Sequence, residues 1–268
     1  MRVKDLPAAL WGRLRNRALS LLGSPRPYYF LPSPSVESQI IRFRYRGKTF
    51  IVEAGHSTPL YETIAEVVDF DCYQLERLDA GALSHGVILD VGANVGIAAL
   101  CLSQLSGRGV VCFEPVPENA TRLRANLASN GVLHATVVES AITRINGKVS
   151  FWVPEHEDVG GHVTAVAPGE SGRLREVDSI DLMTALSYVE GPIALVKVDC
   201  EGGEYDLLTQ LTPAIVERIS ALTFEIHERG EGRNLEAAAR RLRELGFTLS
   251  FRPDPFGREQ LHHVLARR

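Results

Sequence analysis

Acidic residues stand beside a glycine-rich turn in this sequence, in a pattern suited to holding a small cofactor. Asp90 precedes a turn that contains Gly92 and Gly96, and Glu114 ends the next apolar run, about twenty residues after the turn. Glycines let the backbone approach a ligand closely, and the helix expected after Gly96 presents unpaired N–H groups. An acidic residue at the position of Glu114 typically accepts hydrogen bonds from both ribose hydroxyls of a nucleoside.

The charge of Asp90 discriminates between two nucleoside cofactors. Its carboxylate would repel the pyrophosphate of NAD, whereas it would attract the ammonium and sulfonium groups of S-adenosylmethionine. We therefore predict S-adenosylmethionine as the cofactor, bound by Asp90, Gly92, Gly96 and Glu114. Two alternatives stay open at this point: an NAD-type dehydrogenase, and a purely structural role in which the glycines allow tight packing and Asp90 caps the next helix.

A second group of charged residues follows two later apolar runs. Lys197, Asp199 and Glu201 are spaced by two residues at the end of one run, and Glu225 and His227 have the same spacing in the next. Such residues share a face of an extended strand, and open α/β sheets bind ligands at the carboxyl ends of their strands. An alcohol that accepts a methyl group benefits from a general base or from a metal. We predict that Asp199, Glu201, Glu225 and His227 are catalytic, with His227 the natural base near neutral pH.

The same four side chains offer hard oxygen ligands and one imidazole, which is enough to bind Mg²⁺ or a similar ion. No short-range ligand motif such as HExxH occurs, and His262 and His263 are expected on the last strand, away from the site. We therefore predict no metal and leave a bound ion as an alternative. For Lys197 we expect a structural ion pair with Asp199, and a purely structural role stays open for His227.

Short apolar runs rich in β-branched residues alternate with helical patterns from residue 86 onward. This alternation predicts a parallel sheet covered on both faces. A Pro-rich turn, RPDPFGRE, joins the last two runs and indicates a closing hairpin. The predicted fold class is α/β, a Rossmann-like, doubly wound, mostly parallel sheet with an antiparallel strand near the C-terminus. After the third strand we expect a hairpin through residues 145–148 and a long Gly-rich loop at 154–176 that covers the acceptor.

The chain divides into three predicted parts. Residues 1–35 contain a short amphipathic helix at 5–22 and a Pro/Ser-rich linker, residues 36–84 form a small hairpin and helix subdomain or lid, and residues 85–268 form the Rossmann-like domain. The N-terminal helix is expected to dock on its own domain or on a second subunit, which makes a homodimer a candidate assembly. Attachment to a membrane surface is the alternative.

Within the small subdomain, two alternating runs flank Arg46, Gly47 and Lys48, which predicts a β-hairpin. Helical segments are expected at residues 59–68 and 72–78.

Composition limits the partners. A net charge of −4 and a pI near 6.1 argue against nucleic acid as the main partner, because phosphate binding depends on a surplus of Lys and Arg. No run reaches the ~18 apolar residues of a membrane span, and charged residues interrupt any signal peptide. The four cysteines are scattered without CxxC spacing, which favours a reduced, cytoplasmic location.

With these motifs in place, the sequence resembles the FkbM-type methyltransferases. The resemblance spans roughly residues 78–227, in the order of the family's motifs, and the N-terminal fifth carries no matching motif. The matching elements are the DVGANxG loop at Asp90–Gly96, FEP at Phe113–Pro115, a helix ending NxxxN at Asn126–Asn130, KxDxEGxE at Lys197–Glu204, and EIH at Glu225–His227.

The resemblance implies a class I methyltransferase fold and S-adenosylmethionine as the cofactor. It adds Asn94 to the residues that line the cofactor site, and Glu139, Ser140 and Ala141, after the third strand, would lie near the adenine. Members of the family mostly methylate hydroxyl groups, so we predict an O-methyltransferase for a sugar, a glycosylated lipid or another natural product. The alternatives are a non-catalytic cofactor-binding subunit and a nucleic-acid ribose methyltransferase.

Overall fold

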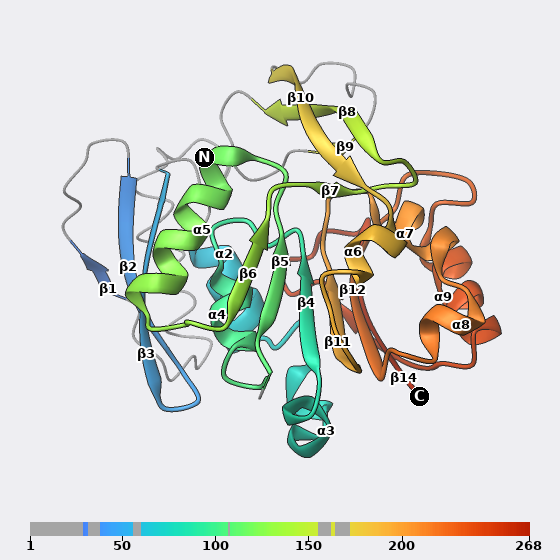
Figure 1. The fold of residues 1–268 in the computed structure, drawn as a ribbon, viewed down its shortest axis with the longest axis horizontal. Helices are drawn as coiled ribbons and strands as arrows, with labels where there is room; N and C mark the ends of the chain where they lie inside the picture. The colour runs from blue at the N-terminus through green and yellow to red at the C-terminus, as the bar shows by residue number, and fades with distance from the viewer. Residues whose placement is uncertain (1–28, 32–37, 56–59, 107, 155–161, 164–171) are drawn as a thin grey trace, which may run out of the picture.

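A seven-stranded sheet forms the centre of the molecule (Figure 1), in the order β13-β14-β12-β11-β4-β5-β6. The computed structural model describes residues 29–31, 38–55, 60–106, 108–154, 162–163 and 172–268, so the N-terminal helix predicted at 5–22 lies outside the described residues. The strands of the central sheet are β4 (Val87–Val91), β5 (Val110–Phe113), β6 (Ala135–Val138), β11 (Ile193–Val198), β12 (Ala221–His227), β13 (Thr248–Pro253) and β14 (Leu261–Arg267).

The pairing within this sheet confirms the predicted fold class. Neighbouring strands from β6 to β12 run parallel, whereas β14 pairs antiparallel with both β12 and β13. The Pro-rich turn joins β13 to β14 as a hairpin, as predicted. Because β14 lies between β12 and β13, its side chains become neighbours of β12, although β12 and β14 are far apart in the sequence.

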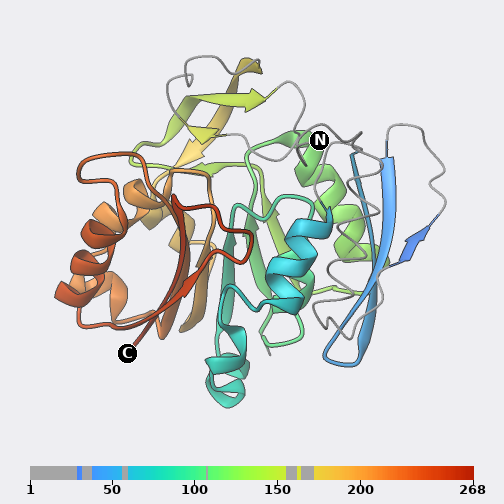
Figure 2. The ribbon, with the colours of Figure 1, turned by 180° about the vertical axis from the view of Figure 1, so that it is seen from behind.

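Both faces of the sheet are covered. Ile88 and Leu195 pack in one hydrophobic cluster, whereas Leu89 and Val196, the next residue in each strand, pack in another. Successive residues of a strand point to opposite faces, so each cluster lies on one face. Figures 1 and 2 show the corresponding helices to either side of the sheet. The first cluster includes α4 (Ile97–Leu102) and α5 (Pro117–Ser129), and the second includes α6 (Leu182–Leu186), α7 (Glu204–Gln210), α8 (Pro213–Val216) and α9 (Leu235–Glu244).

A three-stranded antiparallel sheet precedes these elements, with β1 (Tyr29–Leu31), β2 (Ser38–Tyr45) and β3 (Lys48–Gly55) in sequence order. The predicted hairpin is confirmed. Arg46 and Gly47 form a two-residue turn with φ angles of 44° and 85°, the left-handed pair that suits the twist of a hairpin. The apolar side chains of this hairpin belong to the same cluster as α4 and α5.

Two asparagines of α5 hold this hairpin. Asn126 accepts a hydrogen bond from the N–H of Glu53 at 2.9 Å and donates to the carbonyls of Glu53 and Val95, both at 2.8 Å. One helical turn later, Asn130 accepts from the N–H of Ile51 at 2.9 Å and donates to its carbonyl at 2.7 Å. Residues four apart share a helix face. The two asparagines of the NxxxN motif can therefore bond to Glu53 and Ile51, which are two residues apart along the edge of β3.

The segment between β3 and β4 is more broken than predicted. The first expected helix is present, but the second, at 72–78, shrinks to a single 3₁₀ turn. Its start is replaced by an irregular bend, because the carboxylate of Asp71 accepts the N–H of Leu75 at 2.6 Å and Gln74 adopts a left-handed φ of 54°. The elements here are α2 (Leu60–Ile64), a π-helical turn (Ala65–Asp69), the 3₁₀ turn (Leu75–Arg77) and α3 (Ala80–Ser84).

A small sheet, in the order β7-β10-β8-β9, lies beyond the carboxyl ends of the parallel strands (Figure 1). The hairpin predicted through residues 145–148 is wrong, because β7 and β8 each pair with β10 rather than with each other. Asn146 in that turn accepts instead from the N–H of Asp181, just after β10, at 2.9 Å. The predicted loop at 154–176 is correspondingly too long. The strands are β7 (Ala141–Ile142), β8 (Gly147–Pro154), β9 (His162–Val163) and β10 (Gly172–Ile180).

The described helices give no membrane span, since each is too short or too polar to cross a bilayer. All four cysteines are free, and Cys101 and Cys112 are buried in the core as small apolar side chains.

We expect Asn126→Ala to lower the free energy of unfolding by about 1–3 kcal/mol, because it leaves the buried carbonyl of Val95 and two partly buried backbone groups of Glu53 without partners. Asn130→Ala is the matched control. Its bonds with β3 are exposed to solvent, so water replaces them and the loss should stay below about 1 kcal/mol. Equal shifts of the two variants in urea denaturation would contradict this interpretation.

Candidate functional site

A cavity of about 400 Å³ opens at the carboxyl ends of β4, β5 and β11. The residues predicted for the cofactor and those predicted for catalysis meet in this one space. Those that line it are Gly92, Asn94, Glu114, Ser140 and Ala141 from the first group and Asp199, Glu201 and Glu225 from the second.

The two glycines of the turn after β4 have different constraints. Gly92 has a φ of 76°, and a Cβ there would lie 1.7 Å from the carbonyl oxygen of Asp199, so no other residue fits. Gly96 has a φ of 98°, and a Cβ there would meet Leu123 of α5 at 2.5 Å. Gly92 therefore brings the turn against β11, whereas Gly96 allows α5 to pack closely on the turn.

Glu114 holds the turn from the end of β5. Its carboxylate accepts the N–H of Asn94 at 2.8 Å and that of Val116 at 2.9 Å, and the residue is 5% exposed. Burial raises the pKa of Glu114 to about 7 despite these hydrogen bonds. The side-chain oxygen of Asn94 is shielded from solvent and has no hydrogen-bond partner among the described residues. Both side chains line the cavity and have acceptor capacity for a ligand's hydroxyl or amino groups.

Lys197 lies beneath the turn and contacts three acceptors. Its Nζ is 3.1 Å from Asp90 Oδ1, 2.9 Å from the carbonyl oxygen of Gly92 and 3.5 Å from Asp199 Oδ2. The expected ion pair with Asp199 is therefore present, but Asp90 is the nearer partner. Asp90 is fully buried behind Lys197 and does not line the cavity. Although burial lowers the pKa of Lys197, the charges of Asp90 and Asp199 raise it above its usual value.

Tyr73 reaches the site from the segment before β4. Its hydroxyl donates to Asp199 Oδ2 at 2.7 Å, and the Nζ of Lys197 lies 5.3 Å from its ring centroid. Its backbone carbonyl accepts from the hydroxyl of Thr223 on β12 at 3.0 Å, which fixes its position. Burial raises the pKa of Asp199, but Lys197, His227 and Tyr73 together hold it below its usual range.

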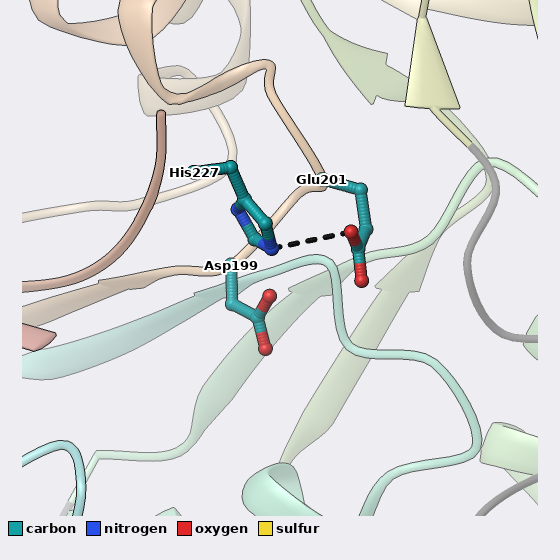
Figure 3. A group of neighbouring side chains, drawn as sticks. All are labelled: Asp199, Glu201 and His227. Carbon is teal, nitrogen blue, oxygen red and sulfur yellow. Dashed lines mark ion pairs between the residues drawn. The ribbon is translucent and has the colours of Figure 1, made fainter. Parts of the chain in front are cut away.

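Carboxylates surround the imidazole of His227 (Figure 3). The Nε2 atom lies 3.2 Å from Glu201 Oε2 and 3.6 Å from Glu225 Oε1, so Glu225 and His227 share a face as predicted. On the other side of the ring, Nδ1 lies 3.0 Å from Oε1 of Glu204, a fully buried residue at the start of α7. Asp199, Glu201 and His227 are close enough for their donor atoms to lie within 4.8 Å of one another.

This environment bears on the predicted role of His227 as a base. Burial lowers the pKa of His227, but its contacts with Glu201 and Glu204 raise it well above the ordinary value. An imidazole that keeps its proton does not take one from an acceptor. In this state His227 positions the carboxylates around it, and its catalytic role stays a prediction.

The expectation that His263 lies away from the site is wrong. It stands opposite Glu225 in the pairing of β12 with β14, and its Nδ1 is 3.8 Å from Glu225 Oε2. The insertion of β14 beside β12 causes this proximity. His263 is fully buried, and burial lowers its pKa to about 4.

The comparisons with known proteins agree with this geometry. A sequence model described as the methyltransferase FkbM domain matches residues 90–249, which is more than half of the chain. The chain belongs to the FkbM methyltransferase family. Its central sheet accordingly has the class I methyltransferase fold.

One curated relative is the AMB antimetabolite synthetase AmbE of Pseudomonas aeruginosa, 27% identical over 210 residues. The match covers 63% of this chain, which spans only about 10% of the length of that protein. Among solved structures, precorrin-6y C5,15-methyltransferase of Geobacter metallireducens has a TM-score of 0.44 and 14% identity, with 75% of this chain and 89% of the other covered. The T. thermophilus 16S rRNA N2 G1207 methyltransferase, in complex with AdoMet and guanosine, has a TM-score of 0.47 and 13% identity, with 96% and 62% covered.

The three residues of this FkbM domain that were predicted to lie near the adenine do not stay together in the structure. Ser140 and Ala141 line the cavity, whereas the partly exposed carboxylate of Glu139 pairs with Arg124 of α5 and does not reach it. Two residues of β8, Phe151 and Val153, add an apolar wall to the cavity. Sequence reasoning missed this wall because it treated β8 as part of a separate hairpin.

Sequence reasoning also missed Tyr73 and Glu204. Tyr73 belongs to a segment without a family motif and is some 126 residues from Asp199, its partner, so no local pattern indicates it. Glu204 was visible as the last residue of the KxDxEGxE motif. Its position at a helix start, where it accepts the N–H of Gly202 at 3.0 Å, explains why the motif ends with an acid.

We expect Lys197→Met to lower the free energy of unfolding by about 3–5 kcal/mol, because it leaves Asp90 as a buried charge without a counter-ion. The double variant Asp90→Asn, Lys197→Met removes that charge and should recover a large part of the loss. Urea denaturation measures both changes. A double variant no more stable than Lys197→Met would show that the pair is not the source of the stability.

We expect the affinity for S-adenosylhomocysteine to rise with pH. Because the pKa of Glu114 is about 7, its ionised fraction grows between pH 6 and pH 8, and only the carboxylate accepts two ribose hydroxyls. The dissociation constant should therefore fall about tenfold over this range. Calorimetric titrations at both pH values measure it, with Glu114→Gln as the control that abolishes the trend. An affinity of the unsubstituted protein that does not change with pH would contradict the assignment.

Proposed function

We propose that this chain transfers a methyl group from S-adenosylmethionine to a hydroxyl group of a small or glycosylated acceptor. One observation carries the proposal: the residues suited to the cofactor and the acidic residues suited to the acceptor line the same cavity. A methyl donor held at the turn after β4 and an acceptor held at the ends of β11 and β12 would thus face each other. Such alignment supplies much of the rate of a bimolecular displacement.

On the donor side, Glu114 would accept the ribose hydroxyls, and Asn94 Oδ1 has unused acceptor capacity. Ser140, Ala141 and Phe151 would border the adenine. The cofactor supplies an electrophilic methyl group, whose bond to sulfur breaks with its electron pair as the acceptor oxygen forms the new bond to carbon. Asp90 would act indirectly. It pairs with Lys197, whose Nζ donates to the carbonyl of Gly92 in the turn.

On the acceptor side, a carboxylate of the group Asp199, Glu201 and Glu225 would receive the hydroxyl proton. Glu225 is the best placed of the three, because its Oε2 makes no hydrogen bond within the described residues. Burial and the charges of Asp199 and Glu66 raise the pKa of Glu225 well above its ordinary value, which makes its ionised form the stronger base. Tyr73, which donates to Asp199, would orient that carboxylate. His227 would position Glu201 and Glu225.

The acceptor class is a sugar, a glycosylated lipid or another natural product. The match to AmbE, by its description an antimetabolite synthetase, supports an acceptor from specialised metabolism. The net charge of −4 disfavours a nucleic-acid acceptor. A cytoplasmic location is part of the proposal, because the four free cysteines suit a reducing compartment.

Binding of S-adenosylhomocysteine tests the cofactor assignment. We expect it to raise the melting temperature of the protein by mass action. Glu114→Ala should weaken binding, whereas Glu118→Ala, an exposed carboxylate of α5 paired with Arg175, should not. Absence of stabilisation, together with stabilisation by NAD, would contradict the proposal.

Turnover tests the acceptor side. With a panel of sugar and polyketide hydroxyl compounds, we expect consumption of S-adenosylmethionine, and Asp199→Asn should lower the rate constant about 100-fold or more. The variant should keep most of its affinity for S-adenosylhomocysteine, because the amide has the same shape, leaves the backbone against Gly92 unchanged and still accepts from Tyr73. Transfer to RNA but not to any small acceptor would refute the acceptor class.

A further inference from the structure

The side chains around His227 form a set of donors suited to a metal ion. Asp199 and Glu201 come from the turn after β11 and His227 from the end of β12, and one donor atom of each lies within 4.8 Å of the others. Figure 3 shows the three side chains converging from two neighbouring strand ends. Two carboxylates and one imidazole match the ligand preferences of Mg²⁺ and Mn²⁺ better than those of softer ions.

The imidazole is oriented as a ligand would be. Glu204 accepts at 3.0 Å from Nδ1 of His227, and its own position is fixed by complete burial and by the N–H of Gly202. With Nδ1 donating to Glu204, Nε2 faces Glu201 and Glu225, and a cation bound there would take the place of the proton that Nε2 holds between these carboxylates. Carboxylates commonly orient metal-bound histidines in this way, through the ring nitrogen that does not bind the metal.

Glu225 supplies an independent indication of a cation. It is 5% exposed and lines the cavity, and its Oε2 has no hydrogen-bond partner within the described residues. The Nδ1 of His263 lies 3.8 Å from Oε2, but burial lowers the pKa of His263 to about 4, so this imidazole supplies no positive charge. Its other oxygen lies 3.6 Å from His227 Nε2, beside the three donors. Lys197, the nearby buried cation, contacts Asp90 and Asp199 instead. A buried carboxylate oxygen without a donor calls for a neighbouring positive charge.

We propose that Asp199, Glu201 and His227 bind one divalent cation of the Mg²⁺ or Mn²⁺ class. Glu225 stands next to the ion and supplies further negative charge. Tyr73 donates to Asp199 Oδ2, which leaves Oδ1 for the ion. Asp199 and Glu201 line the cavity, so an ion held by them would be open to an acceptor there.

The ion would activate the hydroxyl group of the acceptor, a role that rests on the proposed function. An acceptor hydroxyl bound to the cation loses its proton more readily, because the metal stabilises the resulting oxygen anion. Glu225 would receive that proton, and the acceptor oxygen would form its new bond to the methyl carbon as the bond from carbon to sulfur breaks with its electron pair. The same two strand ends would therefore hold the acceptor and activate it.

Binding of Mn²⁺ alone tests the site, without cofactor or acceptor. The full chain is treated with EDTA, freed of chelator and titrated with Mn²⁺, and free ion is followed by electron paramagnetic resonance. We expect saturable binding of a single ion that Mg²⁺ displaces. Glu201→Gln and His227→Gln should each weaken it at least tenfold, and Glu204→Gln should weaken it about 10- to 100-fold through the orientation of the ring.

Glu228→Gln is the matched control, since this carboxylate follows His227 directly but pairs with His262 at 3.3 Å outside the cluster. It should leave Mn²⁺ affinity unchanged, and thermal melting confirms that each variant is folded. No saturable binding, or binding that survives both Glu201→Gln and His227→Gln, would overturn the metal site. Titration with S-adenosylhomocysteine is separate, so failure of the proposed methyl transfer and failure of the metal site give different results.

Discussion

The buried ammonium of Lys197 is the interaction on which the site depends. It lies between β4 and β11, where it joins the carboxylates of Asp90 and Asp199 to the carbonyl of Gly92. Two carboxylates and a turn with a left-handed glycine would be unfavourable together in the interior, because buried charges need partners. One cation compensates both acids and fixes the turn. The strands β4 and β11 pair in parallel, with Val91 opposite Val198. The next residues, Gly92 and Asp199, therefore also lie close together.

The N-terminal sheet and the segment after it are part of the site's construction. The hydrogen bonds of Asn126 and Asn130 to β3 attach the hairpin to α5, which in turn packs on the turn at Gly96. Further along, Tyr73 reaches Asp199 and Lys197. A short chain segment without a recognisable motif therefore closes one side of the cavity and orients one of its carboxylates.

The cavity has two electrostatic halves. Around Glu114 the carboxylate is buried and held by backbone N–H groups, which suits a neutral hydroxyl donor. Around His227 the carboxylates outnumber the cations among the described residues, which suits a metal ion or a group that gives up a proton. Under the proposed function, this division would let one half bind the cofactor and the other half activate the acceptor.

The sequence by itself determined the class of the fold and the position of the glycine-rich turn after β4. The alternation of apolar runs and helices, the positions of Asp90, Gly92 and Glu114, and the order of the motifs all depend on local spacing, which a strand or a helix converts directly into geometry. It also placed Glu225 and His227 on one face, because β12 is regular there.

Only the tertiary structure decided which of these residues face a ligand. Asp90 and Gly96 have structural partners, Lys197 and Leu123, that come from distant segments, and Glu139 turns to Arg124. The pairing of β8 with β10 brought Phe151 to the cavity, and the place of β14 between β12 and β13 brought His263 beside Glu225. These contacts depend on which strands pair with each other. The pairing is set by the free energy of the whole chain, so the hydrophobic pattern of a single segment does not reveal it.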